Sequence, residues 1–396
     1  MFRTIKKKKE ILLAFAGAGF FILVFFLAQP AHSLAEYAEE ILYTCSNEEY
    51  RPACYDREIP KLMDLGISME DAFTITRLVQ EKDNSYFYCH VLGHNLSAKE
   101  TAKDPSKWKE VITRAPSGMC SNGGIHGAFQ ERFRVESLPD ATVAELESLL
   151  AGICQKRDGW DPTLLEQATC THAIGHLAMY VTGGDIQKSL ELCNQASFND
   201  GRYDFRPICF DGVFMQLFQP LEPEDFALIE GKQPVLETVD AYCEQFNGAQ
   251  FKSCRSESWP LYGEAVEAPE GIARICSPIE DKELQFRCYS GMFYVVTASR
   301  LNLDEGKMTD FCSQFSQERK NQCFANAASR MIETDWRKIP ASVAFCARAK
   351  RYGAEDACYE ELLLYSTYNF HAGSKEFFEL CKALPQMWKS RCLEAA

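Results

Sequence analysis

The chain has 396 residues, of which 46% are hydrophobic and 12% aromatic, a composition typical of an ordered globular protein and not of a disordered one. Its formal net charge is −14, and because the first ten residues contribute +4, the rest of the chain carries −18. A body this acidic repels phosphate backbones, which excludes nucleic acid as an expected partner.

The first 35 residues have the pattern of a targeting segment. Arg3 and the lysines from Lys6 to Lys9 precede about eighteen apolar residues that end at Ala28. A run of this length is close to what spans a bilayer, and its basic flank is expected on the cytoplasmic side. We predict that residues 1–35 are a membrane anchor, or a signal peptide cleaved near Ala35. The body is then extracytoplasmic (periplasmic or extracellular), anchored to the membrane, or secreted after cleavage.

Eighteen cysteines in an exported chain predict a disulfide framework, since that compartment permits disulfides and the number is even. Most of them form close pairs along the sequence: Cys45 with Cys54, Cys154 with Cys170, Cys193 with Cys209, Cys243 with Cys254, Cys276 with Cys288, Cys312 with Cys323, Cys346 with Cys358, and Cys381 with Cys392. Cys89 and Cys120 are the two cysteines that belong to none of these close pairs. A bridge between these two is the favoured interpretation, and free or metal-binding thiols are the alternatives.

The second cysteines of the later pairs recur at a nearly fixed period. Cys254, Cys288, Cys323, Cys358 and Cys392 are 34, 35, 35 and 34 residues apart. Such a period indicates helical hairpins, each a helix, a short turn and a second helix. It resembles that of tetratricopeptide and Sel1-like repeats, in architecture only. We therefore predict an all-α, disulfide-stapled solenoid of helical hairpins.

The intervals are irregular in the first half of the chain and regular in the second. A segment rich in proline and acidic residues, from Phe218 to Pro234, lies between the two halves. The predicted organisation is irregular helical repeats over residues 36–220 and regular repeats over residues 221–396.

Five of the seven histidines lie in three short stretches of the irregular half. His90 and His94 occur in "CHVLGH", His172 and His176 in "CTHAIGH", and His126 in "CSNGGIHG". On a helix, residues four apart lie on one face about 6 Å from each other, so each pair presents two imidazoles in one direction. Each stretch follows the second cysteine of its hairpin, and stacked hairpins would bring all five imidazoles together. This pattern predicts a metal site, with structural packing of the histidines as the alternative.

Imidazole ligands favour copper, zinc or iron over calcium and magnesium. One or two ions per chain fit the spacing. Haem held by two histidines is a weaker possibility, because the chain has no Cys-x-x-Cys-His motif. Additional ligands or hydrogen-bond partners for the imidazoles are expected at Gln130, Glu131, Asp211 and Met215. A coordinating methionine would favour copper, although a methionine at helical spacing is more often part of the core.

Close packing near the disulfides is the expected role of the glycines that follow the second cysteines. These are Gly93, Gly123, Gly124, Gly175, Gly212 and Gly291.

Two functions remain open at this stage. The first is a membrane-tethered helical repeat protein with a polyhistidine transition-metal site, acting as a redox or hydrolytic enzyme or as a metal-binding or sensing protein. The second is a disulfide-stapled scaffold that binds an envelope protein on its concave face. The histidines gather in the first half, which favours the metal-binding function, but nothing in the sequence decides whether the protein is an enzyme.

Overall fold

The computed structural model describes residues 32–394 except 84, 87, 134–141, 143, 145–147, 149, 151, 198–202 and 221–222. Within these residues the fold is all-α, as predicted, and contains no strand beyond isolated bridges. The α-helices are α2 (Leu34–Thr44), α3 (Arg51–Glu58), α4 (Met69–Lys82), α5 (His90–Lys103), α6 (Trp108–Arg114), α7 (Gly123–Phe133), α9 (Leu164–Val181), α10 (Ile186–Ala196), α11 (Arg206–Phe218), α12 (Pro223–Ile229), α13 (Val239–Cys243), α14 (Gly248–Glu257), α15 (Pro269–Cys276), α16 (Lys282–Ser299), α17 (Glu305–Ser313), α18 (Gln317–Thr334), α19 (Ile339–Ala349), α20 (Glu355–Asn369), α21 (Lys375–Ala383) and α22 (Gln386–Leu393). Short 3-10 helices connect several of them: η1 (Ile59–Leu65), η2 (Pro105–Lys107), η3 (Cys120–Asn122), η4 (Trp259–Glu267), η5 (Trp336–Lys338) and η6 (Lys350–Tyr352).

All nine predicted disulfides are present, with Cα–Cα distances from 4.7 to 5.7 Å. No cysteine of the described residues is free. The bridge between Cys89 and Cys120 excludes the alternative of metal-binding thiolates at these two positions.

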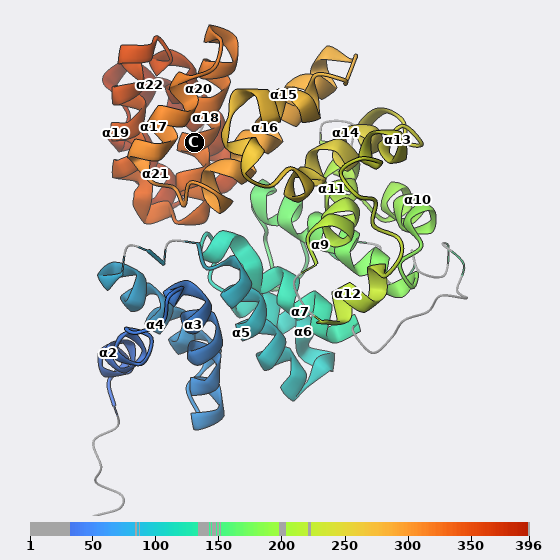
Figure 1. The fold of residues 1–396 in the computed structure, drawn as a ribbon. Coiled ribbons are helices and arrows are strands. Elements are labelled where there is room, and N and C mark those ends of the chain that lie inside the picture. The colour runs from blue at the N-terminus through green and yellow to red at the C-terminus, as the bar shows by residue number, and fades with distance from the viewer. Residues whose placement is uncertain are drawn as a thin grey trace, which may run out of the picture.

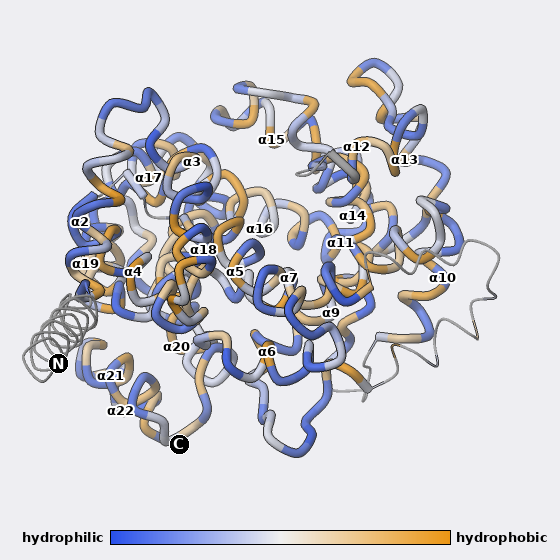
Figure 2. Tube along the Cα trace, turned by 90° about the horizontal axis from the view of Figure 1, so that it is seen from below, coloured by the Kyte–Doolittle hydropathy of each residue, from blue (hydrophilic) through white to orange (hydrophobic). Residues whose placement is uncertain are grey.

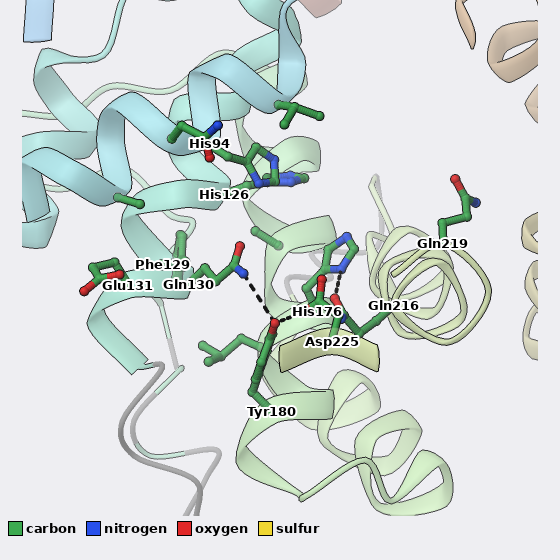
Figure 3. A pocket seen from close by; sticks show the side chains of 15 residues that line it. His94, His126, Phe129, Gln130, Glu131, His176, Tyr180, Gln216, Gln219 and Asp225 are labelled. Atoms are coloured by element: carbon green, nitrogen blue, oxygen red, sulfur yellow. Dashed lines mark hydrogen bonds between the residues drawn. The ribbon is translucent and has the colours of Figure 1, made fainter. Parts of the chain in front are cut away.

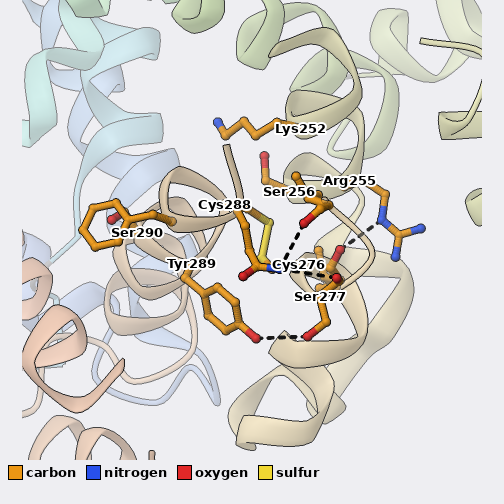
Figure 4. The surroundings of a disulfide bond; sticks show 12 residues. Lys252, Arg255, Ser256, Cys276, Ser277, Cys288, Tyr289 and Ser290 are labelled. Atoms are coloured by element: carbon orange, nitrogen blue, oxygen red, sulfur yellow. Dashed lines mark hydrogen bonds between the residues drawn. A yellow bond between two sulfur atoms is a disulfide. The ribbon is translucent and has the colours of Figure 1, made fainter. Parts of the chain in front are cut away.

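Each later bridge joins the end of one helix to the first turns of the next. In the pair α17 and α18, Cys312 lies in the last turn of α17 and Cys323 in the second turn of α18. Figure 4 shows the same arrangement for Cys276 and Cys288, between α15 and α16. A bridge that closes so short a loop stabilises the fold by about 2–3 kcal/mol, chiefly by restricting the unfolded chain.

One hydrophobic core extends from α2 to α22, with the disulfides buried inside it. Most helices are amphipathic, and Figure 2 shows hydrophobic and hydrophilic stretches alternating along them. An apolar stripe on each helix is buried against its neighbours while the opposite face carries charge, as expected of stacked helical pairs.

The chain of helices closes on itself (Figure 1). Helices α5, α7, α9, α11, α14, α16, α18 and α20 each contact the next, and α18 and α20 return to contact η3 and α9. Ser121 Oγ donates to Thr334 Oγ1 at 3.5 Å, and His371 Nε2 lies 2.9 Å from the carbonyl oxygen of Asp161. A solenoid that stayed open from end to end would keep these segments apart, so the closure departs from the expected architecture.

None of the helices between residues 32 and 394 that the structure describes is long and apolar enough to cross a bilayer. The predicted anchor, at residues 11–28, lies outside the described residues. The predicted boundary near residue 220 falls between α11 and α12, and buried residues of both helices belong to the same hydrophobic core.

Candidate metal centre

Helices α5 and α7 cross in backbone contact, which brings the first three histidines together. A Cβ atom on Gly123 would lie 2.3 Å from the carbonyl oxygen of His90, and one on Gly127 would lie 2.0 Å from that of His94. Only glycine fits at these two positions, because real Cβ atoms essentially never approach closer than 3.0 Å. The predicted role of the glycines in close helix packing is confirmed here, but Gly291 has no atom within 4 Å of its would-be Cβ.

His90, His94 and His126 form a group that can hold a metal ion, with their ligand atoms all within 4.8 Å of one another. The Nε2 atoms of His90 and His94 are 3.1 Å apart. Two nitrogens bound tetrahedrally to one ion at about 2.0–2.1 Å would be roughly 3.3 Å apart, so little movement is needed. The ring of His126 lies 5.0 Å from that of His90 and 4.9 Å from that of His94, measured between centroids.

Hydrogen bonds fix which nitrogen of each imidazole is available. His90 Nδ1 is 3.2 Å from the carbonyl oxygen of Cys120, and His126 Nε2 is 3.2 Å from that of Thr169. A carbonyl oxygen only accepts, so these nitrogens carry the protons. The lone pairs are therefore on His90 Nε2 and His126 Nδ1, and the latter is buried without a hydrogen-bond partner among the described residues. This tautomer pattern is typical of imidazoles that coordinate a metal.

The carbonyl of Cys120 belongs to a left-handed stretch of backbone. Cys120, Ser121 and Asn122 have φ values of 52°, 48° and 55°, which non-glycine residues rarely adopt. The Asn122 side chain stabilises this stretch by accepting a hydrogen bond from the Gly118 N–H at 3.0 Å. The disulfide between Cys89 and Cys120 joins it to the start of α5, directly before His90.

Helices α9 and α11 cross in the same way beside this group. A Cβ atom on Gly175 would lie 2.2 Å from the carbonyl oxygen of Cys209, and one on Gly212 would lie 2.1 Å from that of His172. The Nε2 atoms of His172 and His176 are 3.1 Å apart. His90 is the first residue of α5, whereas α9 begins at Leu164, eight residues before His172. His172 and His176 therefore lie in the middle of α9.

His126 connects the two histidine pairs. Its ring stacks on that of His172 at 5.4 Å and lies 5.5 Å from that of His176. All five predicted histidines thus form one continuous cluster, although only His90, His94 and His126 satisfy the distance requirement for a three-residue site.

Burial keeps these imidazoles neutral. It lowers the pKa of His90 to about 4, and the positive charge of Arg330 adds to the shift. Burial, followed by the neighbouring imidazoles, holds the pKa of His94 and of His126 well below its usual range. The pKa values of His172 and His176 are lowered for the same first reason. Neutral imidazoles offer lone pairs to a cation at neutral pH, which is what metal binding requires.

A cavity of about 180 Å³ opens onto the cluster. His94, His126 and His176 line it together with apolar and amide side chains (Figure 3). This volume accommodates a few water molecules or a small substrate. An ion held by the histidines would therefore be accessible from the cavity.

The chain matches no protein-family model, no curated protein and no solved structure.

The predicted additional ligands have different surroundings. Gln130 lines the cavity, hydrogen-bonds to His94, and donates to the Tyr180 hydroxyl at 3.3 Å; Glu131 lines the same cavity. Met215 Sδ lies 3.3 Å from His172 Nε2. Asp211 accepts hydrogen bonds at 2.9 and 3.1 Å from Lys252, on α14.

Gln216 and Arg330 are residues of the site that the sequence analysis missed. Gln216 Oε1 lies 2.7 Å from His176 Nδ1 and accepts a hydrogen bond from it (Figure 3). The guanidinium of Arg330 lies 5.5 Å from the ring centre of Tyr88, which in turn stacks on His90. Neither contact could be predicted from the sequence. The contact of Gln216 joins α9 and α11, and the contact of Arg330 forms only because the chain of helices closes on itself. Gln216 directly follows Met215, and only the helix crossing reveals its role.

Proposed function

We propose that the chain is an extracytoplasmic transition-metal protein in which His90, His94 and His126 bind one ion. The observation that carries the proposal is the set of unprotonated nitrogens at this helix crossing. His90 Nε2 has its lone pair directed at His94 Nε2, 3.1 Å away, and His126 Nδ1 is buried without a partner among the described residues. Leaving a buried acceptor unsatisfied costs about 1–3 kcal/mol, and a bound cation would remove this cost.

Three nitrogen ligands leave a coordination position for water or substrate, as in catalytic sites with three protein ligands. The cavity beside His94 and His126 supplies the access that such a position needs. Copper, zinc and iron all accept imidazole. We infer that the bound ion activates a small molecule in the cavity, by hydrolytic or redox chemistry according to the metal.

Nine disulfides fit an oxidising compartment, which supports an extracytoplasmic location. We further propose that residues 1–35 direct export and tether the body to the membrane.

The test is the metal content of the untagged body, purified from an oxidising compartment and then titrated with Cu(II), Zn(II) or Fe(II). We expect at least one equivalent of one metal in the parent protein, and its loss in His90→Ala and His126→Ala variants. His371→Ala is the matched control, because His371 is exposed and contacts Asp161 instead of the cluster. Circular dichroism verifies that each variant is folded.

A parent protein that stays free of metal at the end of the titration would refute the proposal. Equal metal content in the folded His90→Ala variant and in the His371→Ala control would also refute it.

A further inference from the structure

The two helix crossings of the histidine cluster, α5 with α7 and α9 with α11, share one sequence pattern. Their first helices carry "HVLGH", ending at His94, and "HAIGH", ending at His176. Their second helices carry "CSNGGIH", ending at His126, and "CFDGVFM", ending at Met215. Both first segments read His-x-x-Gly-His, and both second segments have a cysteine, a glycine three residues later, and histidine or methionine three residues after that.

The three-dimensional contacts establish the same correspondence. Gly123 faces the carbonyl oxygen of His90, and Gly212 faces that of His172. Met215, three residues after Gly212, therefore occupies the position that His126 occupies three residues after Gly123. The counterpart of the three-histidine group is thus a set of two imidazoles and one thioether.

We propose that His172, His176 and Met215 form a second metal site, selective for Cu(I). The proposal extends the proposed function to a second ion but depends on different side chains. Met215 Sδ is 3.3 Å from His172 Nε2, which is itself 3.1 Å from His176 Nε2. Thioether sulfur is a soft ligand that favours Cu(I), whereas Zn(II) is bound mainly by imidazole, thiolate and carboxylate.

The protonation pattern explains why a cation belongs between these groups. His176 Nδ1 donates a hydrogen bond to Gln216 Oε1, and His172 hydrogen-bonds to the backbone of Ile208. His176 Nε2 is therefore unprotonated, and it lies 3.1 Å from His172 Nε2, which is 3.3 Å from Met215 Sδ. A Cu(I) ion among these three atoms would be bound by two imidazole nitrogens and a thioether sulfur, all of them ligands that it accepts.

The surroundings of Met215 differ from those of a core methionine. Its side chain is partly exposed and touches an imidazole nitrogen, whereas Met292 on α16 is fully buried in the hydrophobic core. Leucine has nearly the same volume as methionine, so Met215→Leu preserves packing and removes only the sulfur. Met292→Leu is the matched control.

The experiment is an anaerobic Cu(I) titration of the oxidised protein, without thiol reductants, in competition with a chromogenic Cu(I) chelator. We expect two Cu(I) per chain in the parent and in Met292→Leu. In Met215→Leu we expect one tightly bound Cu(I) and a second bound at least about tenfold more weakly. Removing a residue that only hydrogen-bonds to a metal ligand already lowers metal affinity about 10- to 100-fold, so removing a ligand should have at least this effect. X-ray absorption at the copper edge should show a sulfur neighbour that is lost only in Met215→Leu.

The outcomes separate this inference from the three-histidine site. One Cu(I) in the parent and none in Met215→Leu would support the second site and show that the three-histidine site does not bind Cu(I). One Cu(I) in both proteins, with no sulfur neighbour in either, would overturn the second site and leave the first standing. Two Cu(I) of unchanged affinity in Met215→Leu would also overturn it.

Discussion

Replacing Gly212 by alanine tests the helix crossing that underlies the second set of ligands. The new Cβ would lie 2.1 Å from the carbonyl oxygen of His172, and contacts under 3.0 Å essentially do not occur. Helices α9 and α11 would have to separate by about 0.9 Å. Because the Cβ position is fixed by the backbone of α11 and the carbonyl belongs to the backbone of α9, no side-chain rotation relieves the clash.

Overpacking of this kind costs about 1–3 kcal/mol, and we expect a value near the upper limit. Alanine returns about 1 kcal/mol through its higher helix propensity, which leaves a net loss of about 2 kcal/mol in the free energy of unfolding. The separation also lengthens the contact between His172 and Met215, so Cu(I) affinity should fall while the ion at His90, His94 and His126 is retained.

Gly291→Ala is the control for the substitution at Gly212. Gly291 follows Cys288 as Gly212 follows Cys209, but its would-be Cβ meets no atom within 4 Å, so alanine should stabilise α16 by up to about 1 kcal/mol. The assay is denaturant unfolding of both variants with their disulfides intact, followed by circular dichroism. If Gly212→Ala were as stable as Gly291→Ala, α9 and α11 would not cross as closely as described.

Three further predictions follow from the site and its surroundings. Replacing both Cys89 and Cys120 by alanine should lower the free energy of unfolding by about 2–4 kcal/mol and weaken metal binding, because the bridge fixes the carbonyl that orients His90; denaturant unfolding and metal titration measure the two effects. Gln216→Leu should weaken the second ion about 10- to 100-fold in the Cu(I) titration by removing the acceptor for His176 Nδ1, and an unchanged affinity would contradict this role. Burial raises the pKa of Glu257 to about 8, from 4.5, so the unfolded chain ionises first and this residue reduces stability as pH rises from 4.5 to 8. Glu257→Gln should therefore gain stability over the parent by about 1 kcal/mol or more between pH 5 and pH 8, and a difference independent of pH would contradict the assignment.

The local features of this fold could be predicted from sequence, because they depend on short-range chemistry. An even cysteine count with close spacing identified eight disulfides directly, and elimination identified the bridge between Cys89 and Cys120. Helical spacing also predicted that His90 and His94, like His172 and His176, share one helix face, and the structure places the Nε2 atoms of each pair 3.1 Å apart.

The long-range features could not be predicted in this way. Cysteine spacing does not predict that α18 and α20 return to contact η3 and α9. This return depends on the angle between each helical pair and the preceding pair, which the spacing does not specify. The contribution of Arg330 to the lowered pKa of His90 was invisible for the same reason. Likewise, Asp211 could be placed on the correct helix, but its pairing with Lys252 required knowledge of the facing helix.

Closure of the helices also determines when the centre can form. Ser121 contacts Thr334, and the guanidinium of Arg330 lies over the ring of Tyr88, so segments more than 200 positions apart contribute to the surroundings of His90. Contacts between residues more than 200 positions apart, such as that of Ser121 with Thr334, close large loops and can form only late in folding. If the chain is exported as proposed, His90, His94 and His126 leave the membrane long before the helices that enclose them, since the N-terminal part of a chain emerges first. We therefore expect metal to be acquired only after translocation is complete, from the ions available in the receiving compartment.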